Sequence, residues 1–221
     1  MARPTRTSRA EDRKLRETIL TATGRLLADR RFDELSVADI LAAAGVSRGS
    51  FYFYFESKRD VLAELVRRAV AQGHAAAQPW LQHEDEQDRR TTLLRGIRDG
   101  ARLWQEQAPV LRAIVENWRT DPELFELWQR QMDSYTAATV ARIDRDRAAG
   151  ARLPDAVDPG GIAAALTWLG ERLYYLAAIG VPPFGDENVL VEVLTHIWMS
   201  ALYTGQGGSA RAVHGAEGHA P

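Results

Sequence analysis

The stretch that most constrains this chain is residues 36–55, which read SVADILAAAGVSRGSFYFYF. Ser36, followed three residues later by Asp39, is a short-armed capping box and predicts the start of a helix. Gly45 predicts its end, because glycine readily adopts the positive φ of a tight helix C-terminus. Ser47 is a second candidate cap. The stretch therefore predicts two short helices joined by a tight turn.

This pattern is typical of the helix-turn-helix motif, whose second helix enters the DNA major groove. The second helix here runs from Arg48 to about Tyr54, and its first turn holds the two candidates for base contact, Arg48 and Ser50. The predicted DNA-binding set adds the phosphate candidates and their neighbours: Ser36, Val37, Ser47, Gly49, Tyr52, Tyr54 and Lys58. A packed helical hairpin without any ligand has the same local pattern, so the pattern alone leaves both interpretations open.

Residues 46–62, VSRGSFYFYFESKRDVL, closely resemble the recognition-helix region of the TetR family of transcriptional repressors. The Gly-Val-Ser turn, the aromatic run and the Ser-Lys pair all match, and the resemblance covers residues from about 13 to 73. Tyr54 stands where the family often has His. The resemblance implies an all-α homodimer in which a small domain binds a palindromic DNA operator and a larger domain senses a small apolar effector.

The charge distribution agrees with DNA binding at one end of the chain. The net charge of the 221 residues is only −2. Residues 1–60, however, hold 12 Lys and Arg against 9 Asp and Glu, a net of +3, and the remainder holds 16 against 21, a net of −5. The positive charge lies where an electrostatic footprint for DNA is expected. The acidic remainder argues against a protein that coats nucleic acid.

Composition and motifs exclude several other classes. No apolar run reaches 18 residues, so no membrane span is expected, and no secretory signal precedes Arg13. The absence of cysteine excludes disulfides and thiolate metal sites and fits a cytoplasmic location. The five histidines have no paired ligand spacing, and neither a phosphate-binding glycine loop nor a nucleophile elbow occurs. We therefore expect no enzyme, no catalytic or metal site and no cofactor; a helical adaptor for a protein partner is the other alternative.

The periodicity predicts an all-α fold of about nine helices, with an N-terminal three-helix DNA-binding domain and a larger helical domain for ligand binding and dimerisation. The expected division is a disordered basic arm at 1–12, the helix-turn-helix domain at 13–73, the second domain at 80–204 and a disordered tail at 205–221. The arm could follow DNA or be a solvated tail. The fourth helix is expected to end near Pro79, because proline breaks helices.

The second domain holds all six tryptophans. Each could be a core residue, but together they are typical of an apolar tunnel between helices. Trp128, Met132 and Tyr135 share one face of the long helix that begins at Asp121-Pro122. The predicted ligand-binding residues are Trp104, Asn117, Trp118, Phe125, Trp128, Met132, Tyr135, Trp168, Arg172 and Tyr175.

The last two predicted helices, 159 to about 181 and 186–203, show apolar residues on more than one side, which is typical of helices buried on two sides. One side can face the domain and the other a second subunit, as in a four-helix dimer interface. The residues predicted for that interface are Ile162, Leu166, Leu169, Leu173, Leu190, Leu194, Ile197 and Ala201. A monomeric bundle is the alternative.

The C-terminal half resembles one subgroup, the ethionamide-resistance-type repressors. The resemblance rests on ELWxxxM at 126–132, the Glu171-Arg172 pair and HIWxxxxY at 196–203. It implies a tunnel lined by aromatic residues and asparagines that holds elongated apolar ligands. Here Thr167 and Gly170 stand where the subgroup offers amides, so the polar anchors differ and no ligand identity is carried over.

Overall fold

The computed structural model of the chain describes residues 6–82, 89–150 and 158–203, with the backbone alone for residues 6–10. The described residues form helices and no strand, which confirms the all-α prediction. The helices are α1 (Arg6–Asp29), α2 (Val37–Ala44), α3 (Arg48–Tyr54), α4 (Lys58–Gln82), α5 (Arg89–Glu106), α6 (Ala108–Asn117), α7 (Pro122–Ala148), α8 (Pro159–Ala178) and α9 (Glu187–Leu202).

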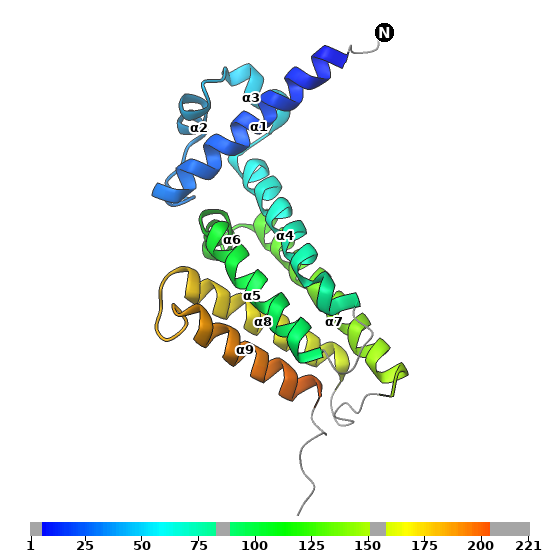
Figure 1. The fold of residues 1–221 in the computed structure, drawn as a ribbon. Coiled ribbons are helices and arrows are strands. Elements are labelled where there is room, and N and C mark those ends of the chain that lie inside the picture. Colours follow the sequence, from blue (N-terminus) through cyan, green and yellow to red (C-terminus); the bar gives the residue numbers. More distant parts are fainter. Residues whose placement is uncertain (1–5, 83–88, 151–157, 204–221) are drawn as a thin grey trace, which may run out of the picture.

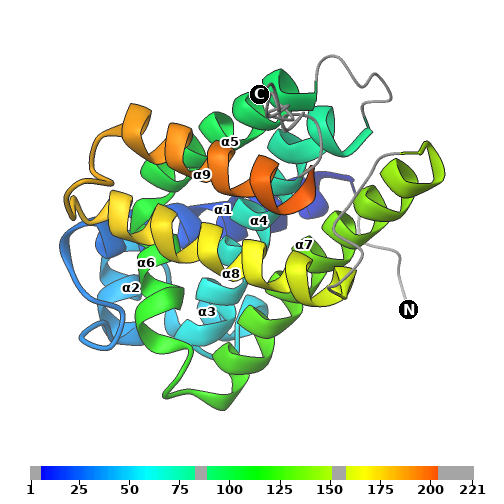
Figure 2. The ribbon, with the colours of Figure 1, turned by 90° about the horizontal axis from the view of Figure 1, so that it is seen from below.

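Helices α1 to α3 form a small domain at one end of the molecule, and α4 runs from it into a bundle with α5 to α9 (Figure 1). Within that bundle α4 packs against α5, α6 and α7. Helices α8 and α9 lie side by side at the end farthest from α2 and α3 (Figure 2). In the described part of the chain no helix is both long and apolar enough to cross a membrane.

The caps predicted for the two motif helices are present. The Ser36 N–H donates to the Asp39 carboxylate at 2.8 Å, and the Asp39 N–H donates to the Ser36 hydroxyl. Hydrogen bonds to the Asp39 carboxylate from the Ser36 hydroxyl and from the Ser36 N–H lower the pKa of Asp39 to about 2. Gly45 has a φ of 65°, and the Ser50 N–H donates to Ser47 Oγ at 3.1 Å. The turn between α2 and α3 is therefore specified by local hydrogen bonds and one left-handed glycine.

Four core residues hold α3 in place. Phe51 and Phe55 are buried, with ring centroids 6.0 Å apart, and they pack with Ile40 of α2 and Ile19 of α1. Truncating a buried phenylalanine to alanine costs about 3–5 kcal/mol. The spacing of four residues between the two rings thus orients the recognition helix, as the sequence indicated.

The predicted disordered arm at residues 1–12 is wrong for its second half, because α1 already begins at Arg6. Disorder was predicted there because residues 6–12 lack the apolar stripe that indicates a helix. Residues 6–12 include four favourable helix formers, Arg6, Arg9, Ala10 and Glu11, and a tertiary contact at Asp12 adds to them. That contact is a hydrogen bond of 3.0 Å from the Tyr54 hydroxyl to Asp12. Residues 1–5 and the predicted tail at 205–221 lie outside the described residues.

The prediction that α4 ends near Pro79 is also wrong, because the helix continues to Gln82. An interior proline costs about 3 kcal/mol. Trp80 and Leu81, however, are 4% and 7% exposed. A tryptophan buries 150–250 Å², which at about 25 cal/mol per Å² stabilises by roughly 4–6 kcal/mol. Their two carbonyls also accept hydrogen bonds from Arg142 and Arg145 of α7. Tertiary burial therefore outweighs the local penalty.

Candidate functional site

The recognition helix α3 presents one exposed face. Arg48, Gly49, Tyr52 and Phe53 lie on it, whereas Phe51 between them is buried. The guanidinium carbon of Arg48 lies 5.9 Å from the centroid of the Tyr52 ring. This contact lies on the exposed face of α3, from which an arginine side chain can reach a base edge. The hydroxyls of Ser47 and Ser50 lie beside it, 2.9 Å apart.

Phe53 was missed by the sequence interpretation. It is the most exposed large hydrophobic residue of the described chain, at 74%. An exposed ring on a recognition helix can contact a thymine methyl group or the sugar backbone. The available signal was its spacing, because a residue four positions after Gly49 lies on the same side of a helix.

Two predicted phosphate contacts are engaged within the protein. The Lys58 ammonium donates to the backbone carbonyls of Phe32, Asp33 and Leu35 at 2.5–3.3 Å, and it lies 4.7 Å from the centroid of the Phe32 ring. Its three donors are thereby used to hold the loop before α2. The Tyr54 hydroxyl donates to Asp12. We therefore remove Lys58 and Tyr54 from the DNA-contacting set.

Two further predicted residues have structural surroundings as well. Ser36 is exposed, but its hydroxyl serves the α2 cap. Val37 is partly buried against the small core of the domain.

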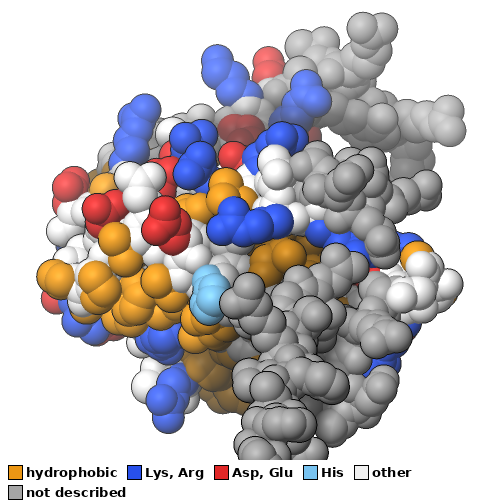
Figure 3. Space-filling view, turned by 60° about the horizontal axis from the view of Figure 1, so that its bottom comes forward, with side chains coloured by type: hydrophobic (Ala, Val, Ile, Leu, Met, Phe, Trp, Pro, Cys, Tyr) orange, Lys and Arg blue, Asp and Glu red, His pale blue; other side chains and the backbone are white. Residues whose placement is uncertain are grey.

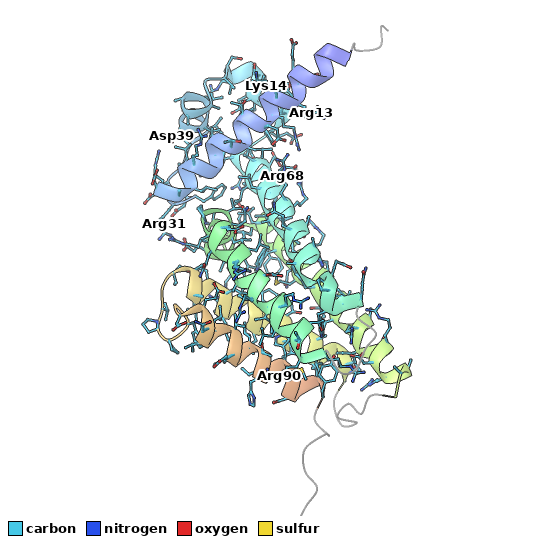
Figure 4. All side chains as sticks on the ribbon, viewed as in Figure 1. Arg13, Lys14, Arg31, Asp39, Arg68 and Arg90 are labelled. Carbon is cyan, nitrogen blue, oxygen red and sulfur yellow. The ribbon has the colours of Figure 1, made fainter. Side chains whose placement is uncertain are left out.

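On α1, by contrast, Arg13 and Lys14 are exposed immediately after Asp12, which the Tyr54 bond places beside α3 (Figure 4). These two cations extend the positive surface that the motif offers to a phosphate backbone.

A second candidate site is an internal cavity of about 150 Å³ inside the helical bundle. Helices α4, α5, α7 and α8 supply most of its wall. The structure brings four predicted ligand residues together there: Trp104, Trp128, Met132 and Tyr135. The face of α7 chosen from the spacing of its aromatic residues is thus one cavity wall, and ligand binding at it stays a prediction.

The other six predicted ligand residues lie away from this cavity. Trp118 stacks on Phe125, with centroids 5.4 Å apart, and also contacts Trp168. Asn117 donates its amide to the Ala113 carbonyl of its own helix. Arg172 is exposed, and the Tyr175 hydroxyl donates to Glu116. For the three of these residues that lie on α8, periodicity does not tell which side faces the cavity, because α8 is apolar around much of its circumference. Ligand binding by the six residues stays a prediction.

The side of α8 that does line the cavity holds Thr167, Gly170, Glu171 and Tyr174. The Tyr174 hydroxyl donates to the Ile97 carbonyl at 3.1 Å. On α7 the Tyr135 hydroxyl donates to the Val70 carbonyl, also at 3.1 Å. Burial raises the pKa of both tyrosines, because desolvation disfavours the phenolate. Both rings are therefore neutral, hydrogen-bonded wall elements.

Gly73 of α4 makes room for the Tyr135 ring. A Cβ atom at position 73 would lie 2.1 Å from the Tyr135 hydroxyl oxygen, closer than real contacts allow. We expect Gly73→Ala to displace Tyr135 and to lower the free energy of unfolding by about 1–3 kcal/mol. Chemical denaturation measures this.

The matched control for this prediction is Gly24→Ala in α1, where a Cβ would meet nothing within 4 Å. It should stabilise the chain by up to about 1 kcal/mol, the helix propensity difference. Adding Tyr135→Phe to Gly73→Ala should recover part of the loss, since the closest atom is removed. Equal stability of the two glycine variants would contradict the packing of this wall.

Two polar atoms on α8 stand out in the apolar cavity. Glu171 is 5% exposed and Thr167 is 9% exposed. Glu171 Oε1 and Thr167 Oγ1 have no hydrogen-bond partner among the described residues. Burial raises the pKa of Glu171, and the neighbouring Arg172 guanidinium, 3.9 Å from Oε2, lowers it less. Buried polar groups are usually paired, so these two atoms indicate a place for a polar group of a ligand.

Comparison with known families assigns both halves of the chain. Residues 19–65 match the family model of bacterial regulatory proteins of the tetR family. Residues 93–204 match the C-terminal domain of the transcriptional regulator EthR. These families consist of regulators rather than enzymes.

Individual proteins agree with this. The HTH-type transcriptional regulator EthR of Mycobacterium tuberculosis is 34% identical over 205 residues, which cover 92% of this chain and 94% of that protein. The regulator of the same name from Mycolicibacterium smegmatis is 32% identical, over 85% of this chain and 86% of that protein.

Solved structures share the fold at low identity. A TetR-family regulator from Syntrophomonas wolfei superposes with a TM-score of 0.71 at 17% identity, covering 86% of this chain and 95% of that one. GusR of Salmonella enterica gives 0.70 at 18%, with the same coverage. The helix-turn-helix, the nine helices of the described chain and the two matched models lead to one conclusion: this protein belongs to the TetR family of DNA-binding transcriptional regulators, with a C-terminal domain of the EthR type.

Proposed function

We propose that this chain is a homodimeric repressor that a small, mostly apolar effector releases from a palindromic operator. The observation that carries the proposal is the course of α4. Its first residue, Lys58, follows directly on the helix-turn-helix, and its middle residues Ala69, Val70 and Gly73 line the cavity. A ligand that changes the cavity wall acts on the helix that carries the DNA-binding domain.

Ion pairs connect α4 to the DNA-binding domain and to a helix that lines the cavity. Arg68 of α4 forms a two-pronged contact with Glu17 of α1, at 2.6 and 2.7 Å (Figure 4). Arg59 at the start of α4 pairs with Asp121, which also caps α7, a cavity wall. The small domain therefore moves with the first turns of α4. An effector shifts the equilibrium only by the difference in its affinity for the two arrangements.

The dimer part of the proposal needs a revised set of residues. Leu166, Leu173, Leu190 and Leu194 are buried inside the chain's own core. Ile162 and Leu169 of α8 and Ile197 and Ala201 of α9 are only partly buried and remain accessible. Leu176 continues the α8 stripe at a spacing of seven. Figure 3 shows hydrophobic side chains gathered on the side of the molecule where α8 and α9 lie.

Leu169→Arg tests the proposed interface. An arginine in the middle of an apolar two-fold contact faces its own copy, so desolvation and like-charge repulsion disfavour association. We expect a monomer in sedimentation velocity at micromolar concentration and a loss of tight operator binding, because one half-site is bound at a time. Ala137→Arg adds the same charge to an exposed position of α7 and should stay dimeric. A Leu169→Arg dimer would place the interface elsewhere.

The experiment that tests the function is selection of random DNA duplexes by the purified protein, read by sequencing at near-physiological salt. A two-fold symmetric protein with two recognition helices should enrich a palindrome whose half-sites lie one or more helical turns apart. Enrichment of such a site supports the repressor. No enrichment by a folded dimer freed of co-purified ligand would contradict it and would favour the protein-adaptor alternative.

A further inference from the structure

We propose that the effector of this protein carries a protonated amine on an otherwise apolar or aromatic body, and that Glu171 and Thr167 bind its ammonium group. The inference rests on the proposed function, since it takes the internal cavity as the effector site, and it specifies the chemical class of the ligand. Three features of the cavity carry it: the polarity of α8, the charge of the wall and the aromatic rings.

The first feature is a pair of side chains on α8 that can accept hydrogen bonds and lie one helical turn apart. Thr167 and Glu171 are four residues apart on α8, so their side chains lie one above the other on one face of the helix. Both line the cavity and both are at least nine-tenths buried. Thr167 Oγ1 and Glu171 Oε1 have no partner within the described chain. A carboxylate oxygen only accepts hydrogen bonds, so the missing partner is a donor.

The second feature is the charge of the wall. Glu171 is the one charged side chain among the described residues that line the cavity. The Arg172 guanidinium lies 3.9 Å from the other carboxylate oxygen of Glu171, and it is half-exposed above the Tyr175 ring. An ion pair of this length and exposure contributes little. Burying a carboxylate without a close partner is costly, and a ligand ammonium supplies that partner.

The third feature is the aromatic wall. Trp80, Trp104, Trp128, Tyr135 and Tyr174 all line the cavity. The faces of such rings attract a cation, and their edges and area accommodate an apolar body. The indole N–H groups of Trp80 and Trp128 also have no partner among the described residues. These groups are donors, so they do not compete for an ammonium; an acceptor elsewhere on the effector would satisfy them.

A matched set of probes tests the charge requirement. The probes are 4-phenylbutylamine, 4-phenylbutan-1-ol and N-acetyl-4-phenylbutylamine, titrated into the full-length protein by calorimetry at neutral pH. They share the same apolar body and differ in a cationic donor, a neutral hydroxyl and a neutral N–H donor. We expect the amine to bind at least roughly tenfold tighter than either neutral probe, as hydrogen bonds to charged groups are the stronger ones. Equal affinity of the amine and either neutral probe overturns the proposal without any variant.

Two substitutions then locate the anchor. Glu171→Gln keeps the shape and removes the charge, and we expect it to weaken amine binding by roughly tenfold to a hundredfold while the affinity for the alcohol stays within about threefold. Thr167→Val should weaken the amine by a smaller factor. Circular dichroism confirms that both variants are folded. An unchanged preference for the amine in Glu171→Gln overturns the assignment of the anchor.

The outcome separates this inference from the proposed function. If the amine binds through Glu171 but does not release the selected operator, the ammonium site is supported and the effector-release mechanism is contradicted. A protein that selects a palindrome but does not prefer the amine keeps the DNA-binding function, and the ammonium site is overturned. Fluorescence anisotropy of a labelled operator, with and without the amine, distinguishes the two.

Discussion

Replacing Arg48 by alanine is expected to lower the affinity for the selected operator by about 30-fold to 10⁴-fold. A good bidentate contact from arginine to a base contributes about 1–3 kcal/mol, and a dimer makes it at two half-sites. Arg48 is exposed in the first turn of α3 and rests on the Tyr52 ring, so its fork is positioned before DNA arrives. Fluorescence anisotropy at fixed salt measures the change, and the thermal stability should be unaffected.

Two further variants separate a base contact from a phosphate contact. Arg48→Lys keeps the charge but loses the planar fork, so a base contact is not restored. Arg130→Ala removes the same charge from an exposed position of α7 and serves as the control for net charge. Full affinity in Arg48→Lys, or a uniform loss over all sequences with a flatter salt dependence, would show that Arg48 contacts a phosphate instead.

Replacing Arg142 by methionine is expected to lower the free energy of unfolding by about 3–5 kcal/mol, the cost of breaking a buried charge pair from one side. Arg142 is 2% exposed, and its Nε donates to Asp146 at 2.9 Å. Its terminal nitrogen donates to the Trp80 carbonyl at 2.6 Å. The substitution leaves the buried Asp146 carboxylate with the Tyr203 hydroxyl, at 2.7 Å, and Arg89, at 3.7 Å.

Urea denaturation monitored by circular dichroism checks this value. Arg147→Met, at an exposed position of the same helix, should change stability by less than about 0.5 kcal/mol. Removing both charges with Arg142→Met and Asp146→Leu should recover part of the loss, because an apolar pair of similar volume avoids the unpaired carboxylate. If Arg142→Met and Arg147→Met lower the free energy of unfolding by equally small amounts, the contacts of Arg142 do not hold the end of α4 to α7.

The helix-turn-helix and the caps could be predicted because they depend on neighbours in sequence. Ser36, Gly45, Ser47 and Asp158 act through hydrogen bonds or dihedral angles within a few residues. The spacing of Phe51 and Phe55 likewise indicated which side of α3 is buried, since a short helix has one core-facing side. For these elements the local signal and the tertiary packing agree, so that the pattern is sufficient.

The candidate sites were predicted less completely, because residue type does not tell which partner a side chain finds. Lys58 and Tyr54 have the chemistry of phosphate ligands, yet Lys58 holds the loop before α2 and Tyr54 reaches Asp12, a residue 42 positions away. In the second domain, α8 is apolar on several sides, and only the packing of α4, α5 and α7 against it shows that Thr167 and Glu171 face the cavity.

The sequence by itself determined the fold class, the turn and caps of the DNA-binding motif, and the family, because these follow from short-range hydrogen bonding and helical periodicity. The tertiary structure decided that α4 continues past Pro79, which residues surround the cavity, and which apolar residues stay accessible for a partner. The physical reason is the same in each case. Periodicity shows that a helix side is buried, whereas the free energy gained there depends on residues distant in the chain.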